Sequence, residues 1–414
     1  MVNLLTSAFN YAERNKSYYS QWTFDQCYAV SASTDSGFEK LHQILYRLIK
    51  HYIVNYKSYI ASYQLTPRRQ HVLDLFQDSP CDVGTYRTDF VISQNGQPKL
   101  IEINNRFPLN GIFEPSFYFS YVNQCSNISP SSADSRAKFN RIYREIERIA
   151  SCYSKLVVLQ GKDLNNSSRF YGELLEASGF KVEFCNIHST PEYITKLDDA
   201  WIISELTLPE IEQIPDNILL HLSQKNILND FKSVLLLHDK SFFSLINSPH
   251  LQASCLSETE RSYLNMFLVR SFSPSNLPSK VLDNALKYKD SWILKSRSLG
   301  KSSEIYAGVN CSNEQWESML SLGNVNEYVL QEYVSQPKFQ GMVKGRPCDD
   351  YATGTILMMN GIYGGLGHFR TSDASVLGAG QEIRQLPVSI FPDDEVMRLD
   401  TADFIRDKIV IGAS

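Results

Sequence analysis

The stretch YRTDFVISQNGQPKLIEINNRFPLNG, residues 86–111, carries the pattern from which the fold of this chain can be inferred. Two apolar runs flank Asn95-Gly96, and an Asn-Gly pair between such runs is typical of a β-hairpin. Asp89 leads into the first expected strand, while Glu102 and Asn104 alternate with isoleucines on the second. Because successive side chains of a strand point to opposite faces, Glu102 and Asn104 share a face. The sequence therefore predicts a hairpin that presents oxygen donors on one side.

These oxygen donors have the composition of a magnesium site. Two carboxylates and an amide are hard ligands that leave room for water and phosphate oxygens, whereas zinc prefers His or Cys. The alternative is a surface hairpin with a solvated polar face, which is the commoner outcome for such a composition. Against it, isoleucines flank Glu102, Arg87 stands two residues before Asp89, and residues 107–111 form a turn-rich exit. We predict that the ligands of Mg²⁺ are Asp89, Glu102 and Asn104.

The overall composition is that of a globular protein and excludes several classes of function. A chain of 414 residues can bury substantial cores, in two or three domains or in one composite catalytic unit. With 40 basic and 45 acidic residues, the net charge of −5 gives no cationic field for nucleic acid or an anionic membrane. No apolar run has membrane-spanning length, and residues 1–5 lack the charged start of a secretory signal, so we expect a cytoplasmic protein. The eight scattered cysteines are expected to be reduced thiols, and no feature indicates an oligomeric state.

The chain changes from a helical pattern to an alternation of strands and helices near residue 155. Apolar residues at three- and four-residue intervals in 38–49 predict a helix within a mainly helical segment that ends at residue 80. Further helices are expected at 136–150 and 170–178. The expected strands are 156–159, 181–184, 200–203 and 234–237. Strand, helix and strand at this spacing indicate a small parallel sheet, and the lack of GxGxxG argues against a Rossmann cofactor site.

A second stretch, residues 280–303, has features of a phosphate site. Residues 292–295 are expected to form a strand that ends in Lys295, and a loop rich in serine and glycine follows at 296–303. Backbone N–H groups of such a loop can surround a phosphate while the lysine adds a positive charge. The expected phosphate-binding residues are Lys280, Lys295, Ser298, Gly300 and Ser302. The loop is not a Walker motif, because Lys295 stands where the first glycine is required, and the alternative is an exposed basic turn.

The strands that follow are expected to complete a nucleotide site. Residues 328–334 predict a strand whose main chain can offer donors and acceptors to an adenine edge. The residues expected to make this contact are Gln331, Glu332, Tyr333 and Val334. Residues 351–383 are expected to form strands around a turn at Asn360-Gly361, and one of these strands carries Arg370. Residues 393–414 are expected to form a helix that closes the fold.

These motifs, in this order, resemble those of a known family. R-x-D, a short hairpin and E-x-N before a proline-containing loop look like the magnesium corner of the circularly permuted ATP-grasp ligases, the group that includes glutathionylspermidine synthetase. In ordinary ATP-grasp enzymes the E-x-N strand lies near the end of the chain, whereas in the permuted group, as here, it lies near the beginning. VLQEYV at 329–334 resembles the hinge strand that reads adenine. The resemblance covers residues 86–111 and 238–383, although the loop after Lys295 has fewer glycines than is usual in the family.

The resemblance implies a fold of the α+β or α/β class, an ATP-grasp fold in circularly permuted order with a small parallel-sheet pre-ATP-grasp domain. The expected units are a helical region with the metal-binding hairpin at 1–150, the pre-ATP-grasp domain at 151–237, a nucleotide-binding subdomain at 238–335, and the rest of the core at 336–414. Asp239-Lys240 resembles the entry to the nucleotide-binding half, so Lys240 is a further candidate.

The resemblance also implies a function, the ATP-dependent joining of a carboxylate to an amine with Mg²⁺ as cofactor. The expected substrates are ATP, a small-molecule carboxylate such as an amino acid or peptide, and an amine. Phosphoryl transfer to the carboxylate gives an acyl phosphate that the amine attacks, and Arg87 or Arg370 stabilises the developing charge. Arg370 stands at the family position of an arginine that faces the triphosphate. Two alternatives stay open: a non-catalytic ATP-binding sensor or scaffold, and a small-molecule kinase.

Overall fold

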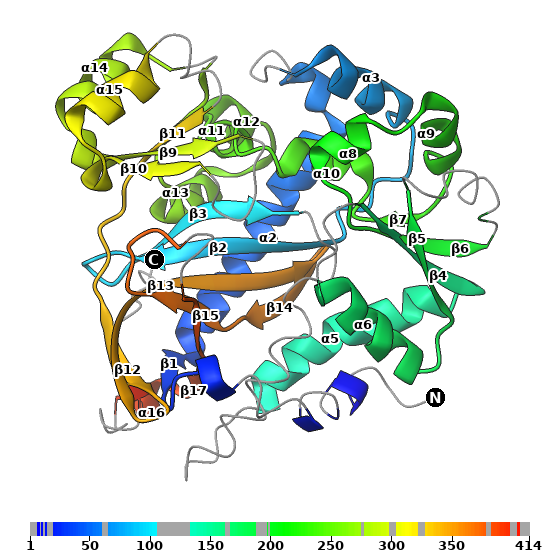
Figure 1. The fold of residues 1–414 in the computed structure, drawn as a ribbon, viewed down its shortest axis with the longest axis horizontal. Coiled ribbons are helices and arrows are strands. Elements are labelled where there is room, and N and C mark those ends of the chain that lie inside the picture. The colour runs from blue at the N-terminus through cyan, green and yellow to red at the C-terminus, as the bar shows by residue number, and fades with distance from the viewer. Residues whose placement is uncertain are drawn as a thin grey trace.

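The computed structural model shows which of the expected elements form and how they meet (Figure 1). It describes residues 6–8, 10, 13–14, 20–59, 65–105, 133–161, 166–187, 197, 199–274, 277–297, 304–321, 328–377, 382–397 and 404–405. Three of the predicted phosphate-binding residues, Ser298, Gly300 and Ser302, lie outside these ranges, and so does the turn-rich exit at 107–111.

A seven-stranded antiparallel sheet forms the centre of the molecule. The strand order is β16-β15-β13-β2-β3, and β12 and β14 pair with the long strand β13. The strands are β2 (Thr85–Ile92), β3 (Pro98–Asn104), β12 (Phe339–Val343), β13 (Arg346–Met359), β14 (Ile362–Leu366), β15 (Phe369–Ser372) and β16 (Arg384–Leu386). The predicted hairpin is confirmed as β2 and β3, and Figure 1 shows it beside β13, which comes from the last quarter of the chain.

Helix α2 (Ala32–Val54) covers one face of this sheet (Figure 1). Its apolar stripe is buried as predicted, and the ring centroids of Phe38 and Phe90 lie 5.0 Å apart. Because residues of β2 alternate between its two faces, Arg87 and Asp89 point away from α2. The helix thus leaves the opposite face of the sheet for the polar residues of the hairpin.

A three-stranded parallel sheet joins the two ends of the described chain. Its order is β17-β1-β18, with β1 (Cys27–Ser31) between β17 (Val388–Phe391) and β18 (Phe404–Ile405). The prediction of a mainly helical beginning therefore missed β1, and the predicted closing helix is wrong at 404–405. Within the described part of 393–414, the helix that forms is α16 (Asp393–Val396), which has four residues. Local patterns missed these strands because each one pairs with a strand from the other end of the sequence.

The predicted small parallel sheet is confirmed, with the order β5-β4-β6-β7. Its strands and flanking helices are β4 (Lys155–Gln160), β5 (Val182–Asn186), β6 (Ala200–Ser204), β7 (Ile227–Leu228), α5 (Ala133–Ala150) and α6 (Asn166–Ala177). The strand predicted at 234–237 is wrong, because these residues belong to helix α10 (Phe231–Leu237). The side chain of Asp230 accepts a hydrogen bond from the Ser233 N–H and so caps this helix. A short, continuously apolar run shows no alternation of polar and apolar residues, so its sequence does not distinguish a buried helix from a buried strand.

A four-stranded antiparallel sheet, with the order β10-β9-β11-β8, carries the predicted lysine strand and hinge strand. Its elements are β8 (Ser271–Phe272), β9 (Trp292–Ser296), β10 (Ile305–Ala307), β11 (Tyr328–Glu332), α14 (Ser279–Lys287) and α15 (Asn313–Leu320). Trp292 and Leu294 pack with Trp316 of α15 and Ala285 of α14 on one face. Strand alternation therefore turns Lys295 to the other face, toward the central sheet. Figure 1 shows β9 and β11 between β3 and these two helices.

Short helices connect the sheets. They are η1 (Ser20–Trp22), η2 (Tyr56–Ser58), α3 (Pro67–Leu75), α8 (Leu208–Glu212), α9 (Asp216–Leu222), α11 (Phe242–Ile246), α12 (Pro249–Cys255), α13 (Glu258–Phe267), η5 (Lys289–Ser291) and η6 (Gly308–Asn310). Among the described helices, none combines the length and the apolar character that crossing a bilayer requires.

Candidate functional site

Four predicted site residues lie on the face of the central sheet that points away from α2. Asp89 and Glu102 are cross-strand partners on β2 and β3, and so are Arg87 and Asn104. The pairing shifts after Asp89, which leaves Ile101 of β3 as an extra residue between two pairs. Such a bulge leaves the extra residue outside the regular ladder, and here its carbonyl oxygen accepts a hydrogen bond from Lys295 Nζ over 3.0 Å.

Asp89 holds two arginines in place. Arg87 donates to Asp89 from Nε over 2.7 Å and from Nη2 over 3.1 Å. Arg370 of β15 donates to the same carboxylate over 2.7 Å, and the Asn104 amide donates over 3.2 Å. Both oxygens of this buried carboxylate therefore accept hydrogen bonds from protein groups. Asp89 acts in this arrangement as the counter-ion of Arg87 and Arg370.

Glu102 is the carboxylate that faces the lysines. Lys240 Nζ lies 3.5 Å from its Oε1, and the Glu102 side chain keeps 20% of its surface exposed. Burial by itself raises the pKa of Glu102, but Lys240, Lys295, Arg87 and Arg370 outweigh burial and lower it below its usual value. Glu102 is therefore ionised at neutral pH and surrounded by positive charge.

Lys295 reaches this group from the four-stranded sheet. Burial lowers the pKa of Lys295 to about 8, an effect that Glu102 opposes and Lys240 reinforces. The structure thus brings together a carboxylate from the first quarter of the chain and a lysine from the third quarter. Whether they bind one nucleotide stays a prediction.

The structure adds residues that the sequence analysis left as reserve or did not name as site residues. Asp239 is fully buried and accepts hydrogen bonds from Arg69 of α3 over 3.1 Å and from Arg297 over 3.2 Å. It also accepts from the Ser241 N–H over 2.9 Å, and helix α11 begins only after Ser241. These bonds fix the chain at the position from which Lys240 reaches Glu102. The only sequence signal for Lys240 was its likeness to the family's entry segment.

His368 is a further residue that sequence reasoning missed. It is buried, and burial together with the nearby Arg370 and Arg87 lowers its pKa to about 3. His368 is therefore neutral beside two arginines at physiological pH. Its position two residues before Arg370 was the available signal.

The predicted adenine contacts divide between the two faces of the four-stranded sheet. Gln331 pairs with Ile293 across the strands and so lies on the Lys295 face, where its amide donates to Ser271 Oγ over 2.9 Å. Glu332 points to the other face and pairs with Arg270 over 2.9 Å.

Two main-chain N–H groups at the end of β11 already donate hydrogen bonds within the protein. The Glu332 N–H donates to the Arg270 carbonyl over 3.0 Å, and the Tyr333 N–H donates to the Ser291 carbonyl over 2.8 Å. An adenine edge would therefore have to use carbonyl groups of this segment or the main chain at Val334.

Lys280 lies apart from Lys295. It stands in the first turn of α14 and lines a cavity of about 440 Å³ together with Trp292, Glu332 and Tyr333. Since α14 packs against the opposite face of β9, the structure does not bring Lys280 to the side where Lys295 meets Glu102. The sequence analysis predicts one shared role for Lys280 and Lys295, whereas strand alternation places them on opposite faces of the sheet.

The donor set fits a magnesium ion only in part. Among the described residues, no group of three His, Cys, Asp or Glu side chains is arranged to hold a metal. Asp89 is already occupied by two arginines, which leaves Glu102 and the amide oxygen of Asn104 from the three predicted ligands. Such a pair suits Mg²⁺ that keeps waters and takes further oxygens from a phosphate ligand.

Comparisons with known proteins identify the fold. A family model described as the AnkG N-terminal domain matches residues 38–236, a span that includes the hairpin but ends before Lys240 and Lys295. No curated protein matches the chain. The structure of a glutathione synthetase-like effector from Globodera pallida, in its apo form, matches with a TM-score of 0.59 and 12% sequence identity. The match covers 93% of this chain and 97% of that chain. The protein therefore shares a mixed α/β fold with this glutathione synthetase-like effector, while the permuted ATP-grasp order and the pre-ATP-grasp domain stay predictions.

Proposed function

We propose that this protein is a cytoplasmic ATP-dependent ligase that joins a small-molecule carboxylate to an amine through an acyl phosphate. The observation that carries the proposal is the convergence of Lys240, Lys295, Arg87 and Arg370 on Glu102. Four cations face two carboxylates there, and this excess of positive charge favours a ligand with several negative charges, such as a triphosphate. The glutathione synthetase-like fold supports a ligase of the ATP-grasp type.

In this proposal the lysines bind the substrate ATP. Lys295 and Lys240 contact the phosphates, with Ser298, Gly300 and Ser302 as further proposed contacts, and Gln331 and Val334 line the adenine. Glu102 and Asn104 would hold Mg²⁺, which would neutralise charge on the phosphate oxygens. Phosphoryl transfer then depends mainly on positioning and on electrostatic stabilisation.

The arginines act on the transferred group. A carboxylate oxygen of the acceptor attacks the γ-phosphorus, the bond to the β-phosphate oxygen breaks, and ADP leaves. The amine then attacks the acyl carbon, loses a proton, and phosphate leaves to give the amide. Arg87 and Arg370, oriented by Asp89, stabilise the charge on the transferred phosphoryl group and on the tetrahedral oxyanion. Neither step requires a covalent enzyme intermediate.

We propose the permuted ATP-grasp order on the same grounds. The hairpin near the beginning and the strands from 346 onward form one sheet, so the E-x-N strand precedes the rest of its own sheet in the sequence. The parallel sheet within 151–237 would then be the pre-ATP-grasp domain that forms part of the acceptor site. The boundaries at 150, 237 and 335 are part of this proposal.

One observation favours an alternative, an ATP-binding protein without turnover. Asp89 is taken up by Arg87 and Arg370, so the protein offers fewer metal ligands than the predicted set of three. Nucleotide binding without ADP release across a panel of acids and amines would favour this alternative. A kinase that phosphorylates a hydroxyl group would release ADP, but hydroxylamine would trap no acyl phosphate.

The test is ADP release from pairs of amino acids and polyamines, followed by mass measurement of the product. We expect Glu102→Gln and Lys295→Ala each to lower substrate-dependent ADP formation by at least about a hundredfold, because the first removes the proposed carboxylate ligand of Mg²⁺ and the second removes a cation that contacts the phosphates. Glu317→Gln and Lys287→Ala, on exposed positions of α15 and α14, are matched controls. Full activity of either site variant in a folded protein would refute the assignment.

A further inference from the structure

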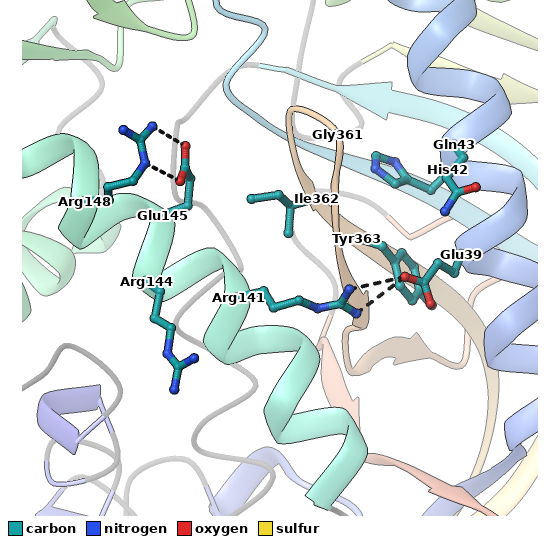
Figure 2. A pocket seen from close by; sticks show the side chains of 10 residues that line it. All are labelled: Glu39, His42, Gln43, Arg141, Arg144, Glu145, Arg148, Gly361, Ile362 and Tyr363. Carbon is teal, nitrogen blue, oxygen red and sulfur yellow. Dashed lines mark hydrogen bonds and ion pairs between the residues drawn. The ribbon is translucent and has the colours of Figure 1, made fainter.

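A second cavity lies on the α2 side of the molecule, away from the group around Glu102. It has a volume of about 430 Å³ and lies between α2, α5 and the turn from β13 to β14 (Figure 2). This volume is in the range of small-molecule sites. Since α2 covers the sheet face opposite to Asp89, the cavity and the proposed nucleotide site lie on different sides of the sheet.

Three arginines of α5 line this cavity. Arg141, Arg144 and Arg148 are three and four residues apart, so they lie along one side of the helix. Arg148 is held by Glu145 through two hydrogen bonds of 2.7 Å. The other two arginines are less firmly held.

Arg141 and Arg144 are the arginines that can take a new partner. Both terminal nitrogens of Arg141 lie 3.4 Å from the same Glu39 oxygen, at the outer limit of a hydrogen bond. Arg144 is exposed and forms no ion pair within the described part of the chain. With three arginines against Glu39 and Glu145, the lining carries an excess of positive charge.

The floor of the cavity is neutral and partly aromatic. His42 and Tyr363 are almost fully buried, and Figure 2 shows Tyr363 beside the end of the Arg141 side chain. Burial lowers the pKa of His42 to about 4, so its ring is uncharged at neutral pH. The floor therefore adds no charge, and the partly exposed side chain of Ile362 offers apolar surface to the organic part of a ligand.

We propose that this cavity binds a small organic oxyanion, a carboxylic acid or a phosphate ester, through Arg141 and Arg144. A guanidinium group matches the geometry of carboxylate and phosphate with paired N–H···O bonds, and such charge-assisted bonds are the strong ones. The oxyanion replaces the long contact between Arg141 and Glu39, and the organic body of the ligand lies against Ile362. The site lies outside the proposed ligase centre and does not depend on it.

The test uses hydrogen exchange on the full chain, because this method locates the bound ligand along the sequence. The probes are citrate for carboxylates and phenyl phosphate for phosphate esters, with sodium chloride at matched ionic strength as the blank. We expect at least one probe to slow exchange in α5 and at the turn around Gly361. If only citrate or only phenyl phosphate slows hydrogen exchange, the result identifies which oxyanion the site prefers.

Variants decide whether the arginines bind the probe. Arg144→Gln and Arg141→Gln are each expected to lower the affinity of the probe that slows exchange by about tenfold, since each removes a charge-assisted hydrogen-bonded pair. Arg346→Gln, an exposed position of β13 outside the cavity, is the charge-matched control and should bind as the parent does. If Arg141→Gln fails to fold, the exposed Arg144→Gln carries the test. Three results would overturn the proposal: neither probe slows exchange, exchange slows only in β2, β3 and β9, or the folded variants bind the probe with unchanged affinity.

Discussion

Two groups of charged side chains lie on the two sides of the central sheet, and they differ in how open they are. On one side, Glu102 faces several cations, and Arg370 keeps 28% of its side chain exposed. On the α2 side, Asp35 forms an ion pair with Lys138, and these side chains are only 1% and 8% exposed. The Tyr363 hydroxyl donates to the same Asp35 carboxylate over 2.7 Å.

Under the proposed function, this difference separates charges arranged for a ligand from charges arranged for stability. The group around Glu102 contains more cations than carboxylates, so an added anion completes it. The Asp35–Lys138 pair is closed to solvent, and a buried charge that loses its partner is strongly destabilising. Substitutions in the first group should therefore change binding more than stability, and substitutions in the second should do the reverse.

The largest effect is expected at the buried pair. Asp35→Ala leaves Lys138 with one carboxylate partner fewer, and we expect the free energy of unfolding to fall by about 3–5 kcal/mol. Denaturant unfolding followed by circular dichroism measures the change. Asp349→Ala, which removes an exposed partner of Lys338, is the control and should cost less than about 1 kcal/mol. Equal losses in the two variants would break the comparison.

Asp239 should show both kinds of effect, because it is fully buried and adjoins Lys240. Asp239→Asn keeps the shape of the side chain but removes the charge that holds Arg69 and Arg297. We expect the free energy of unfolding to fall by about 2–3 kcal/mol, and the affinity for MgATP to fall as well. Denaturation and calorimetry on the same preparation measure the two losses. An unchanged affinity in the destabilised variant would assign Asp239 to stability alone.

Lys240→Ala should change binding with little change in stability. Under the proposed function we expect MgATP to bind about ten- to a hundredfold more weakly, because a charge-assisted contact to phosphate is lost. Lys295, Arg87 and Arg370 still surround Glu102, so the unfolding free energy should fall less than in Asp35→Ala. Isothermal calorimetry is the measurement, with Lys287→Ala as the control. Unchanged affinity would remove Lys240 from the site.

The smallest effect is expected for the pH dependence of stability, through the buried His42 of α2. Burial lowers the pKa of His42 from 6.5 to about 4, so the unfolded chain binds more protons than the folded one between these values. Protonation of His42 therefore favours the unfolded chain, and the free energy of unfolding falls as the pH falls from 6.5 toward 4. We expect the parent to lose about 2 kcal/mol more than His42→Gln between pH 7 and pH 5. Identical pH profiles of unfolding for the two proteins would contradict this account.

Sequence reasoning identified the hairpin and its polar face, as well as the strand with Lys295, the strand at 328–332 and the small parallel sheet. In each of these segments the decisive pattern lies within a few residues: a turn pair, a two-residue alternation, or an apolar run with a clear start and end. It failed at 234–237, where a buried helix and a buried strand look alike. It also missed β1 and β18, whose partners lie at opposite ends of the chain.

The amino-acid sequence by itself determined which face of the hairpin carries Glu102 and Asn104, because strand alternation is a property of neighbouring residues. Only the tertiary structure decided which cations meet them. Lys295 bonds to a carbonyl 194 residues away, and Lys280 is turned away although it lies close to Lys295 in the sequence. The physical reason is that charge pairing depends on distance in space, and packing of β9 against α14 sets that distance.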